Sequence, residues 1–187
     1  MKKTLFAIVL LVAVIGMPLF AWEPEDLTKF PPCMDESSWI LNLGAGFHGL
    51  PRLGDGYLWI PPVHFSLDKN VALGDKGLPF FFGGAFGFSG HGYKKGDVDW
   101  FIGTLTPAFR FGYHFNWDVD WLDTYAVTQL GWHIYTGPKE HRPYKIGFPS
   151  VGVNIGARVF VADWFGFFLE VSAGSYWGGD IGFVFKF

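Results

Sequence analysis

Apolar residues alternate with small or polar ones along eight segments of this chain. The clearest segment runs from residue 148 to 161, where Val151, Val153 and Ile155 are each followed by a glycine or an asparagine. Successive side chains of a β-strand point to opposite faces of its sheet, so this alternation predicts a strand with one apolar face. We therefore predict strands over residues 37–48, 57–67, 78–90, 100–115, 121–136, 148–161, 165–174 and 181–187.

Eight strands of this kind predict an all-β fold, an eight-stranded antiparallel transmembrane up-and-down β-barrel. A tilted strand crosses a bilayer with about 9–11 residues, and about eight strands make the smallest usual bacterial barrel. Turns are expected at one end, over residues 68–77, 116–120 and 162–164. Loops are expected at the other end, over residues 49–56, 91–99, 137–147 and 175–180. Aromatic residues near strand ends should form interfacial girdles, namely Trp39, Tyr57, Trp100, Trp121, Tyr135 and Trp164.

The composition favours a membrane barrel over a soluble one. The chain holds 22 Phe and 9 Trp but only 17% charged residues, whereas a soluble domain has about 25%. In the alternative fold, a soluble up-and-down barrel such as a lipocalin, the apolar face would point inward. The outer face would then carry too little Lys and Glu for a soluble surface. The net charge of −3 also argues against nucleic acid as a partner.

The first 21 residues have the pattern of a secretory signal peptide. Lys2 and Lys3 precede an apolar run over residues 5–15, and Ala21 is a small residue at the expected cleavage site. An uncleaved anchor helix is the alternative, but the run is short for a span of about 20 residues. Residues 22–36 show no strand pattern and are expected to form a periplasmic tail, with a plug in the lumen as the alternative. Residues 37–187 are expected to form the barrel.

Two segments and the chain end carry a family resemblance. The segments TPAFRFGYHF (106–115) and GARVF (156–160) and the eight-strand layout resemble small outer-membrane barrels of the OmpX/OmpW/OmpA-domain kind. The last strand resembles the C-terminal sorting signal of such barrels, with alternating apolar residues at Ile181, Phe183, Phe185 and Phe187. The resemblance implies a bacterial outer-membrane location, contact with outer-membrane lipid and recognition by the barrel-assembly machinery.

The polar face of the predicted strands carries several titratable side chains. We expect a lumen cluster of ion pairs and polar groups formed by Arg110, Arg158, Glu170, His64 and His114. Arg158 and Glu170 lie on neighbouring strands across a short turn and are expected to pair. Small eight-stranded barrels are filled by side chains. A structural plug and a gate or binding site for a small polar solute both remain open.

Two successive prolines interrupt the second predicted strand. Pro61 and Pro62 remove two ladder donors that would point to opposite neighbours. Together with the apolar Trp59 they are candidates for a lateral opening in the wall. OmpW-like barrels pass small apolar molecules through a lumen that opens sideways, so the resemblance implies such a solute here. The alternative is that the prolines lie at a strand end beyond the hydrocarbon.

No catalytic residue, cofactor or metal site is expected. His64 and Ser66 show the His-x-Ser spacing of outer-membrane lipid A deacylases, but their parity places them on the lumen face. The histidines lack the spacing of a zinc site, and Cys33, the only cysteine, allows no internal disulfide. We expect a porin-like channel or binding barrel for small, hydrophobic molecules. The alternative is a structural or adhesin-like barrel with a closed lumen, whose outer loops bind a host or phage surface.

Overall fold

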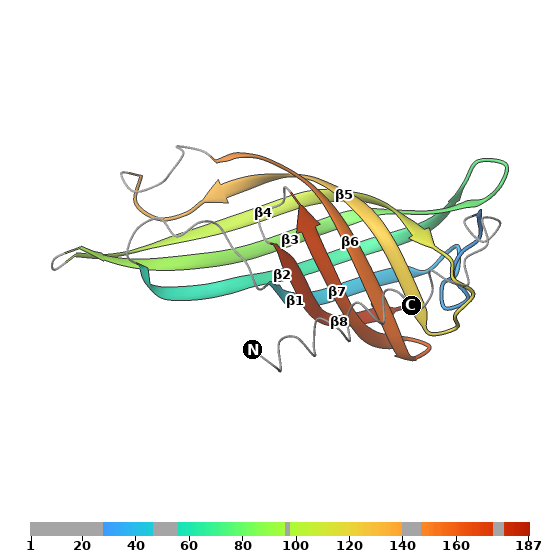
Figure 1. The fold of residues 1–187 in the computed structure, drawn as a ribbon. Coiled ribbons are helices and arrows are strands. Elements are labelled where there is room, and N and C mark those ends of the chain that lie inside the picture. The colour runs from blue at the N-terminus through green and yellow to red at the C-terminus, as the bar shows by residue number, and fades with distance from the viewer. Residues whose placement is uncertain (1–27, 47–55, 96–97, 140–146, 174–177) are drawn as a thin grey trace.

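The computed structural model describes residues 28–46, 56–95, 98–139, 147–173 and 178–187. Each strand pairs antiparallel with the next in sequence, and β8 pairs with β1 to close the barrel (Figure 1). The strands are β1 (Trp39–Gly46), β2 (Gly56–Leu73), β3 (Leu78–Lys95), β4 (Val98–Phe115), β5 (Leu122–Tyr135), β6 (Phe148–Ala162), β7 (Phe165–Ala173) and β8 (Gly179–Lys186). The predicted fold class is confirmed.

Two predicted boundaries are wrong. Strand β2 runs to Leu73, so Asp68 lies inside a strand and not in a turn. Its polar sequence read as a turn, yet Asp68 and Asn70 alternate with half-buried residues and face the lumen. Strands β3 and β4 extend to Lys95 and from Val98, so most of the predicted loop at 91–99 is a paired hairpin. The predicted signal segment at 1–21 lies outside the described residues, as does most of the loop at 49–56.

The barrel is apolar outside and polar inside. Ile155 and Val161 on its outer wall are 67% and 63% exposed, whereas Arg110, Arg158 and Asp68 in the lumen are 0% exposed. This distribution is the reverse of a soluble barrel and is that of a transmembrane barrel, whose outer wall faces lipid. Among the described residues, no helix is long and apolar enough to cross a membrane.

The strands differ greatly in length. β2, β3 and β4 have 18 residues each, and β1 and β8 have 8. At about 3.3 Å per residue these lengths correspond to roughly 60 Å and 26 Å. The long strands therefore continue as a sheet beyond the end of the short ones, at the end opposite the C-terminus (Figure 1). We call this part, residues 56–60, 89–95 and 98–104, the projecting sheet.

The described girdle residues near the chain termini lie on the outer wall, and those at the other end do not. Trp39, Trp121 and Trp164 are 40%, 50% and 60% exposed near the chain termini. Trp100 and Tyr135 lie instead in an inward-facing cluster with Ile102 and Phe148. The side chain of Tyr57 lies outside the described ones.

Because the outer wall is apolar, a charged side chain at its centre should destabilise the barrel. Ile155→Arg, in the middle of β6, should lower the free energy of unfolding in lipid vesicles by about 2–4 kcal/mol, because the guanidinium meets hydrocarbon. Urea titration of the refolded protein measures this value. Asp163→Arg, in the exposed turn after β6, is the control and should be near neutral. An equally small effect at Ile155 would show that this face does not lie in the bilayer.

Candidate functional site

Arg110 lies at the centre of a buried ionic network that crosses the lumen. Its terminal nitrogens donate to both carboxylate oxygens of Glu170, at 3.2 and 2.9 Å. Its Nε donates to Oδ1 of Asp68 at 3.2 Å. The three side chains come from β4, β7 and β2, so the bonds join opposite parts of the wall. Because all three are at most 1% exposed, the charges interact with little screening by water.

Arg158 extends the network from β6. It donates to Asp123 at 2.8 Å, to Asp68 at 3.4 Å and to the side-chain oxygen of Asn42 at 3.2 Å. Asp68 therefore connects the two arginines. The predicted pairing of Arg158 with Glu170 is wrong. Asp123 lies directly opposite Arg158 across the β5–β6 ladder, whereas Phe168 lies opposite it on β7.

Neutral groups complete the hydrogen bonds of the network. The Tyr125 hydroxyl donates to Glu170 at 2.9 Å, and the Asn154 amide donates to it at 2.6 Å. The guanidinium of Arg158 also lies 4.0 Å from the centre of the Tyr125 ring. Buried carboxylates and guanidinium groups are tolerated only when they are paired and hydrogen-bonded. The described centre of the lumen meets that condition and is filled by side chains.

Two glycines make room for contacts that skip a strand. Gly83 of β3 lies between Asp68 and Arg110 in the registers of β2–β3 and β3–β4. A Cβ at Gly83 would lie 2.5 Å from Oδ1 of Asp68. Gly156 of β6 lies in the same way between Tyr125 and Glu170, and a Cβ there would overlap the Tyr125 ring. Side chains on the outer two of three strands can therefore meet over the middle one.

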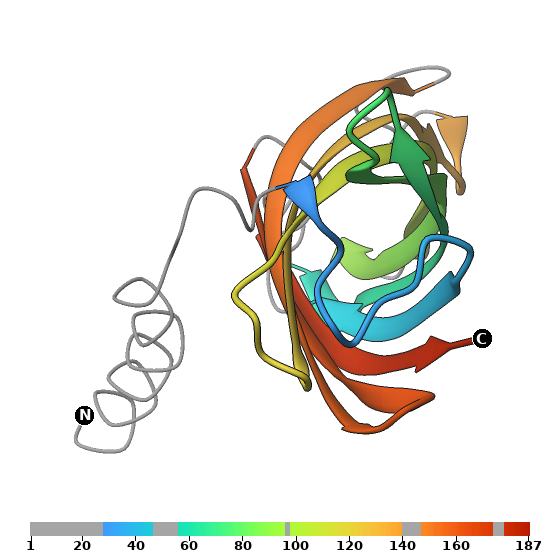
Figure 2. The ribbon, with the colours of Figure 1, turned by 90° about the vertical axis from the view of Figure 1, so that its right-hand side faces the viewer.

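The N-terminal segment, residues 28–38, covers the lumen at the end that holds the C-terminus. Cys33 and Met34 pack against apolar side chains of the barrel interior, namely Ile40, Phe160, Phe168 and Val184. The Phe30 ring lies 5.8 Å from the His114 ring. Viewed from this end, the segment passes in front of the ring of strands as a blue trace (Figure 2). Residues 28–36 therefore pack against the barrel mouth. Of the two expectations for this segment, a tail and a plug in the lumen, the packing favours the plug.

Polar bonds fix this segment in place. The Asn70 amide donates to the carbonyl of Asp35 at 2.9 Å, and Lys186 donates to the carbonyl of Cys33 at 2.8 Å. Burial raises the pKa of the Cys33 thiol to about 12. The thiol is therefore protonated and unreactive at neutral pH, which gives Cys33 a packing role.

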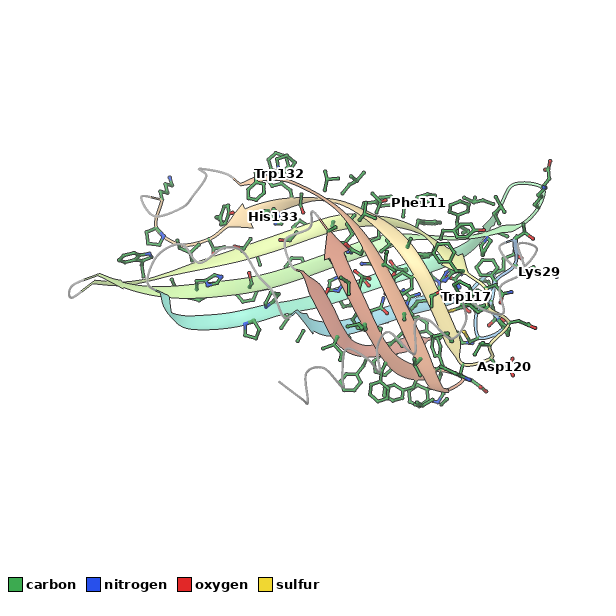
Figure 3. The ribbon with its side chains drawn as sticks, in the orientation of Figure 1. Lys29, Phe111, Trp117, Asp120, Trp132 and His133 are labelled. Carbon is green, nitrogen blue, oxygen red and sulfur yellow. The ribbon has the colours of Figure 1, made fainter. Side chains whose placement is uncertain are left out.

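An aromatic layer fills the lumen toward the projecting sheet. Ile102 and Tyr135 are each 4% exposed and pack against Trp100 and Phe148. Below them, Nδ1 of His133 lies 2.9 Å from the Thr106 hydroxyl. Figure 3 shows His133 and Trp132 toward this end of β5, and Lys29, Trp117 and Asp120 at the opposite end. The described lumen is therefore filled at three levels: the N-terminal segment, the ionic network and this aromatic layer.

Four of the five predicted lumen residues belong to the ionic network, and His64 does not. Arg110, Arg158 and Glu170 are described above, and His114 lies 2.7 Å from Asp123. His64 pairs separately with Asp180 of β8, with 3.3 Å between Nδ1 and Oδ2. Ser66 accepts a hydrogen bond from Asn42 at 2.8 Å. Within the described ranges, no group of three or more His, Cys, Asp and Glu side chains could hold a metal ion.

The sequence prediction missed three acids of the lumen. Asp68 read as a turn residue, and Asp180 lay at the edge of a predicted loop. Asp123 shares the parity of Tyr125 and could have been assigned to the inward face of β5. Parity within the strand, applied over its full length, is the signal that finds all three.

Pro61 and Pro62 lie where β2 passes the end of β1. Over the described residues the β1–β2 ladder runs as far as Ala45 and Val63, and the register with β3 shifts between Ile60 and Val63. One extra residue in β2 at this point is a β-bulge, which accommodates missing donors. Trp59 belongs to β2 by its backbone, and its side chain lies outside the described ones.

The C-terminal residues close the barrel seam. The backbone of Phe187 exchanges two hydrogen bonds with Trp39, at 2.7 and 3.0 Å. Ile181 and Phe183 point outward and are 60% and 50% exposed. The Phe185 ring lies beside the Phe165 ring, with 5.4 Å between ring centres and an angle of 49° between the ring planes. The predicted assembly signal is therefore an apolar, outward-facing edge of β8.

Comparison with known proteins finds similarity to solved structures and not to known sequences. No family model matches the chain, and no curated protein matches it in sequence. A similar solved structure is that of Ail, the attachment invasion locus protein of Yersinia pestis, in complex with the heparin analogue sucrose octasulfate. The TM-score is 0.46 at 11% identity, and the match covers 82% of this chain and 100% of that chain.

A double-mutant cycle tests the ionic network. Glu170→Gln and Arg110→Met should each lower the free energy of unfolding by about 3–5 kcal/mol, because each leaves a buried charge without its partner. The double variant should lose less than the sum, with a coupling of about 0.5–3 kcal/mol. Urea unfolding in vesicles gives all four values, and Thr128→Ala on the exposed outer wall is the control. Strictly additive losses would mean that the two side chains do not interact.

Proposed function

We propose that this chain is an integral outer-membrane barrel with a closed lumen that acts at the cell surface through its projecting sheet and outer loops. The observation that supports it most is the ionic network, in which two buried arginines bind three buried carboxylates across the lumen. A solute would have to separate these charges to pass, and removing one partner of a buried pair costs about 3–5 kcal/mol. The adhesin-like alternative is therefore preferred over a channel.

Three features support the outer-membrane location. The outer wall is apolar over its whole circumference, as in the exposed side chains of β2, β5, β6 and β8. The alternating strand that ends at Phe187 resembles a sorting signal for the barrel-assembly machinery, and residues 1–21 resemble a signal peptide. Outer-membrane lipid and the assembly machinery are the partners that follow from this location.

The projecting sheet offers a rigid surface beyond the bilayer. The β3–β4 ladder continues without interruption from Ser89 and Thr104 to Lys95 and Val98. Binding surfaces held by a rigid scaffold require less ordering when a partner binds. We assign no catalytic step to His64 and Ser66, because both side chains are buried in the lumen.

Shortening the projecting hairpin tests the surface role. Gly92 and Phe101 are register partners, so residues 93–100 can be replaced by an Asn-Gly turn. Bacteria that display this variant should lose at least ten-fold in adhesion to an epithelial cell layer, relative to bacteria with the original chain. The control replaces residues 74–77, at the other end, by the same turn and should adhere normally. Adhesion that is absent in the original chain, or unchanged in the variant, counts against the proposal.

One observation favours a second candidate, lateral passage of a small apolar molecule. An apolar groove of about 490 Å³ on the outer wall is lined by Leu43, Val63, Phe65 and Ile181, among others. The groove includes Ala45 and Val63, the β1–β2 register pair next to the bulge at Pro61 and Pro62. An opening at this point would connect the lumen with the groove.

Solute flux separates the two candidates. Refolded protein without residues 1–21 should pass neither small polar nor small apolar solutes into liposomes above the level of empty liposomes, because its lumen is filled. Folding is checked on the same sample by its resistance to detergent unfolding. Apolar uptake that disappears in the Pro61→Val/Pro62→Val variant would instead support the lateral opening and overturn the closed-lumen proposal.

A further inference from the structure

The ladder between β4 and β5 is interrupted at Pro107. Ala108 pairs with Gly131, and the same register places Pro107 opposite Trp132, but this pair and the next one are missing from the ladder. A proline has no backbone N–H and cannot donate to a ladder, so strand prolines are usually confined to edges and strand ends. Pro107 lies instead in the middle of β4 (Val98–Phe115), which has a strand on each side.

The interruption leaves the backbone carbonyl of Trp132 without its ladder donor. In an antiparallel ladder, pairs that exchange two hydrogen bonds alternate with pairs that exchange none. Thr136 donates to the carbonyl of Gly103 at 2.8 Å, so this pair is of the first kind. Counting by two residues along each strand leads to Pro107 and Trp132. The Trp132 carbonyl therefore faces a residue that has no N–H to donate.

The lumen side of this interruption is occupied by side chains. Thr106 and His133 are the next register positions, and both side chains are buried in the lumen. The Thr106 hydroxyl lies 2.9 Å from Nδ1 of His133. Gly131 lies so close to β4 that a Cβ there would be 2.8 Å from the Cβ of Ala108. The interruption is therefore approached from the outer face of the wall.

A groove of about 620 Å³ opens on the outer wall at the interruption. Pro107 and Trp132 both line it, and its sides include Phe109, Leu130 and Val151, which are 52%, 52% and 58% exposed. The volume is in the range of small-molecule sites, about 300–1,000 Å³. Because the groove continues the wall that faces lipid, the occupant that its surroundings supply is an acyl chain.

Trp132 places one end of the groove near the membrane surface. Its side chain is 44% exposed and lies toward the end of the barrel that carries the projecting sheet (Figure 3). Exposed tryptophans of membrane proteins sit at the level of the lipid head groups. At that level an amide-linked acyl chain carries an N–H donor, whereas an ester-linked chain carries only acceptors. A backbone carbonyl without a donor is costly in lipid, so the amide is the better match.

We propose that this groove binds the amide-linked acyl chain of a membrane lipid, whose N–H donates to the Trp132 carbonyl in place of residue 107. The chain then lies along Phe109 and Leu130. The inference requires only that the outer wall faces lipid, and it does not depend on the proposed surface function.

A matched pair of probes tests this hydrogen bond. In propyl tetradecanoate an ester oxygen replaces the N–H of N-propyltetradecanamide, and the two molecules are otherwise the same. Refolded protein without residues 1–21 should bind the amide at least about five-fold more tightly, because an acceptor left unpaired in an apolar site costs that factor or more. Separate titrations in detergent micelles, followed by native mass spectrometry, give the two dissociation constants. Equal affinities would overturn the proposal.

Pro107→Val supplies the missing donor within the ladder. The ratio of amide to ester affinity should therefore fall to about 1, and the folding equilibrium constant in detergent should rise about five-fold, the effect of one added hydrogen bond. A ratio that stays at its original value in this variant would overturn the role of the carbonyl.

Pro149→Val is the matched control from the same groove. Trp132 directs its N–H and its carbonyl toward β4, so its pair with Pro149 on β6 is one that exchanges no hydrogen bond. The substitution changes the surface that both probes touch, and the ratio of their affinities should remain that of the original chain. Loss of the ratio in both proline variants would show that groove shape, and not the carbonyl, selects the amide, and would also overturn the proposal.

A second measurement does not depend on how well a proline variant folds. In the original chain labelled with ¹³C at the tryptophan carbonyls, the NMR signal of Trp132 should move when the amide is added and stay in place when the ester is added. Assignment uses Trp132→Phe, which removes the label from this position. A signal that does not move at saturating amide overturns the proposal.

Discussion

The bridge formed by Asp68 between Arg110 and Arg158 determines how the rest of this barrel must be built. Among the described residues, six charged side chains that are 0% exposed lie inside a wall whose outer face is apolar. In such an environment a charge is stable only beside its partner. The strands must therefore bring the partners together from β2, β4, β5, β6 and β7. A shift of two residues in one strand would keep its apolar face toward lipid but would separate its charges from their partners. The network thus selects one register among those that the apolar pattern alone would allow.

The wall provides the geometry that this network requires. Cross-strand neighbours such as Asp123 and Arg158 meet directly. More distant partners meet over a glycine, as Asp68 and Arg110 do over Gly83, and Tyr125 and Glu170 over Gly156. The lumen of an eight-stranded barrel is just wide enough to be filled by side chains. Glycines in the wall therefore create the space that the arginines occupy, and the lumen closes without any added domain.

The sequence predicts the wall much better than it predicts the contacts inside it. Period-two alternation gives all eight strands and their outward faces, because the bilayer requires apolar side chains on one face. The same parity places Arg110, Arg158, Glu170 and His114 inside. The partner of each arginine depends on the register between strands, which local pattern does not contain. Thus Arg158 pairs with Asp123 across β5–β6 and not with Glu170. Asp68 was missed for a different reason, because the polar composition of its segment predicts a turn.

Closure of the lumen also changes what the polar interior can do. An open pore needs mobile water beside its charged groups, whereas here Arg110, Glu170 and Tyr125 satisfy one another directly. The N-terminal segment and the aromatic layer around Tyr135 separate these groups from the two ends of the barrel. The interior is therefore a structural element, and we propose that contacts with other molecules are made by the projecting sheet.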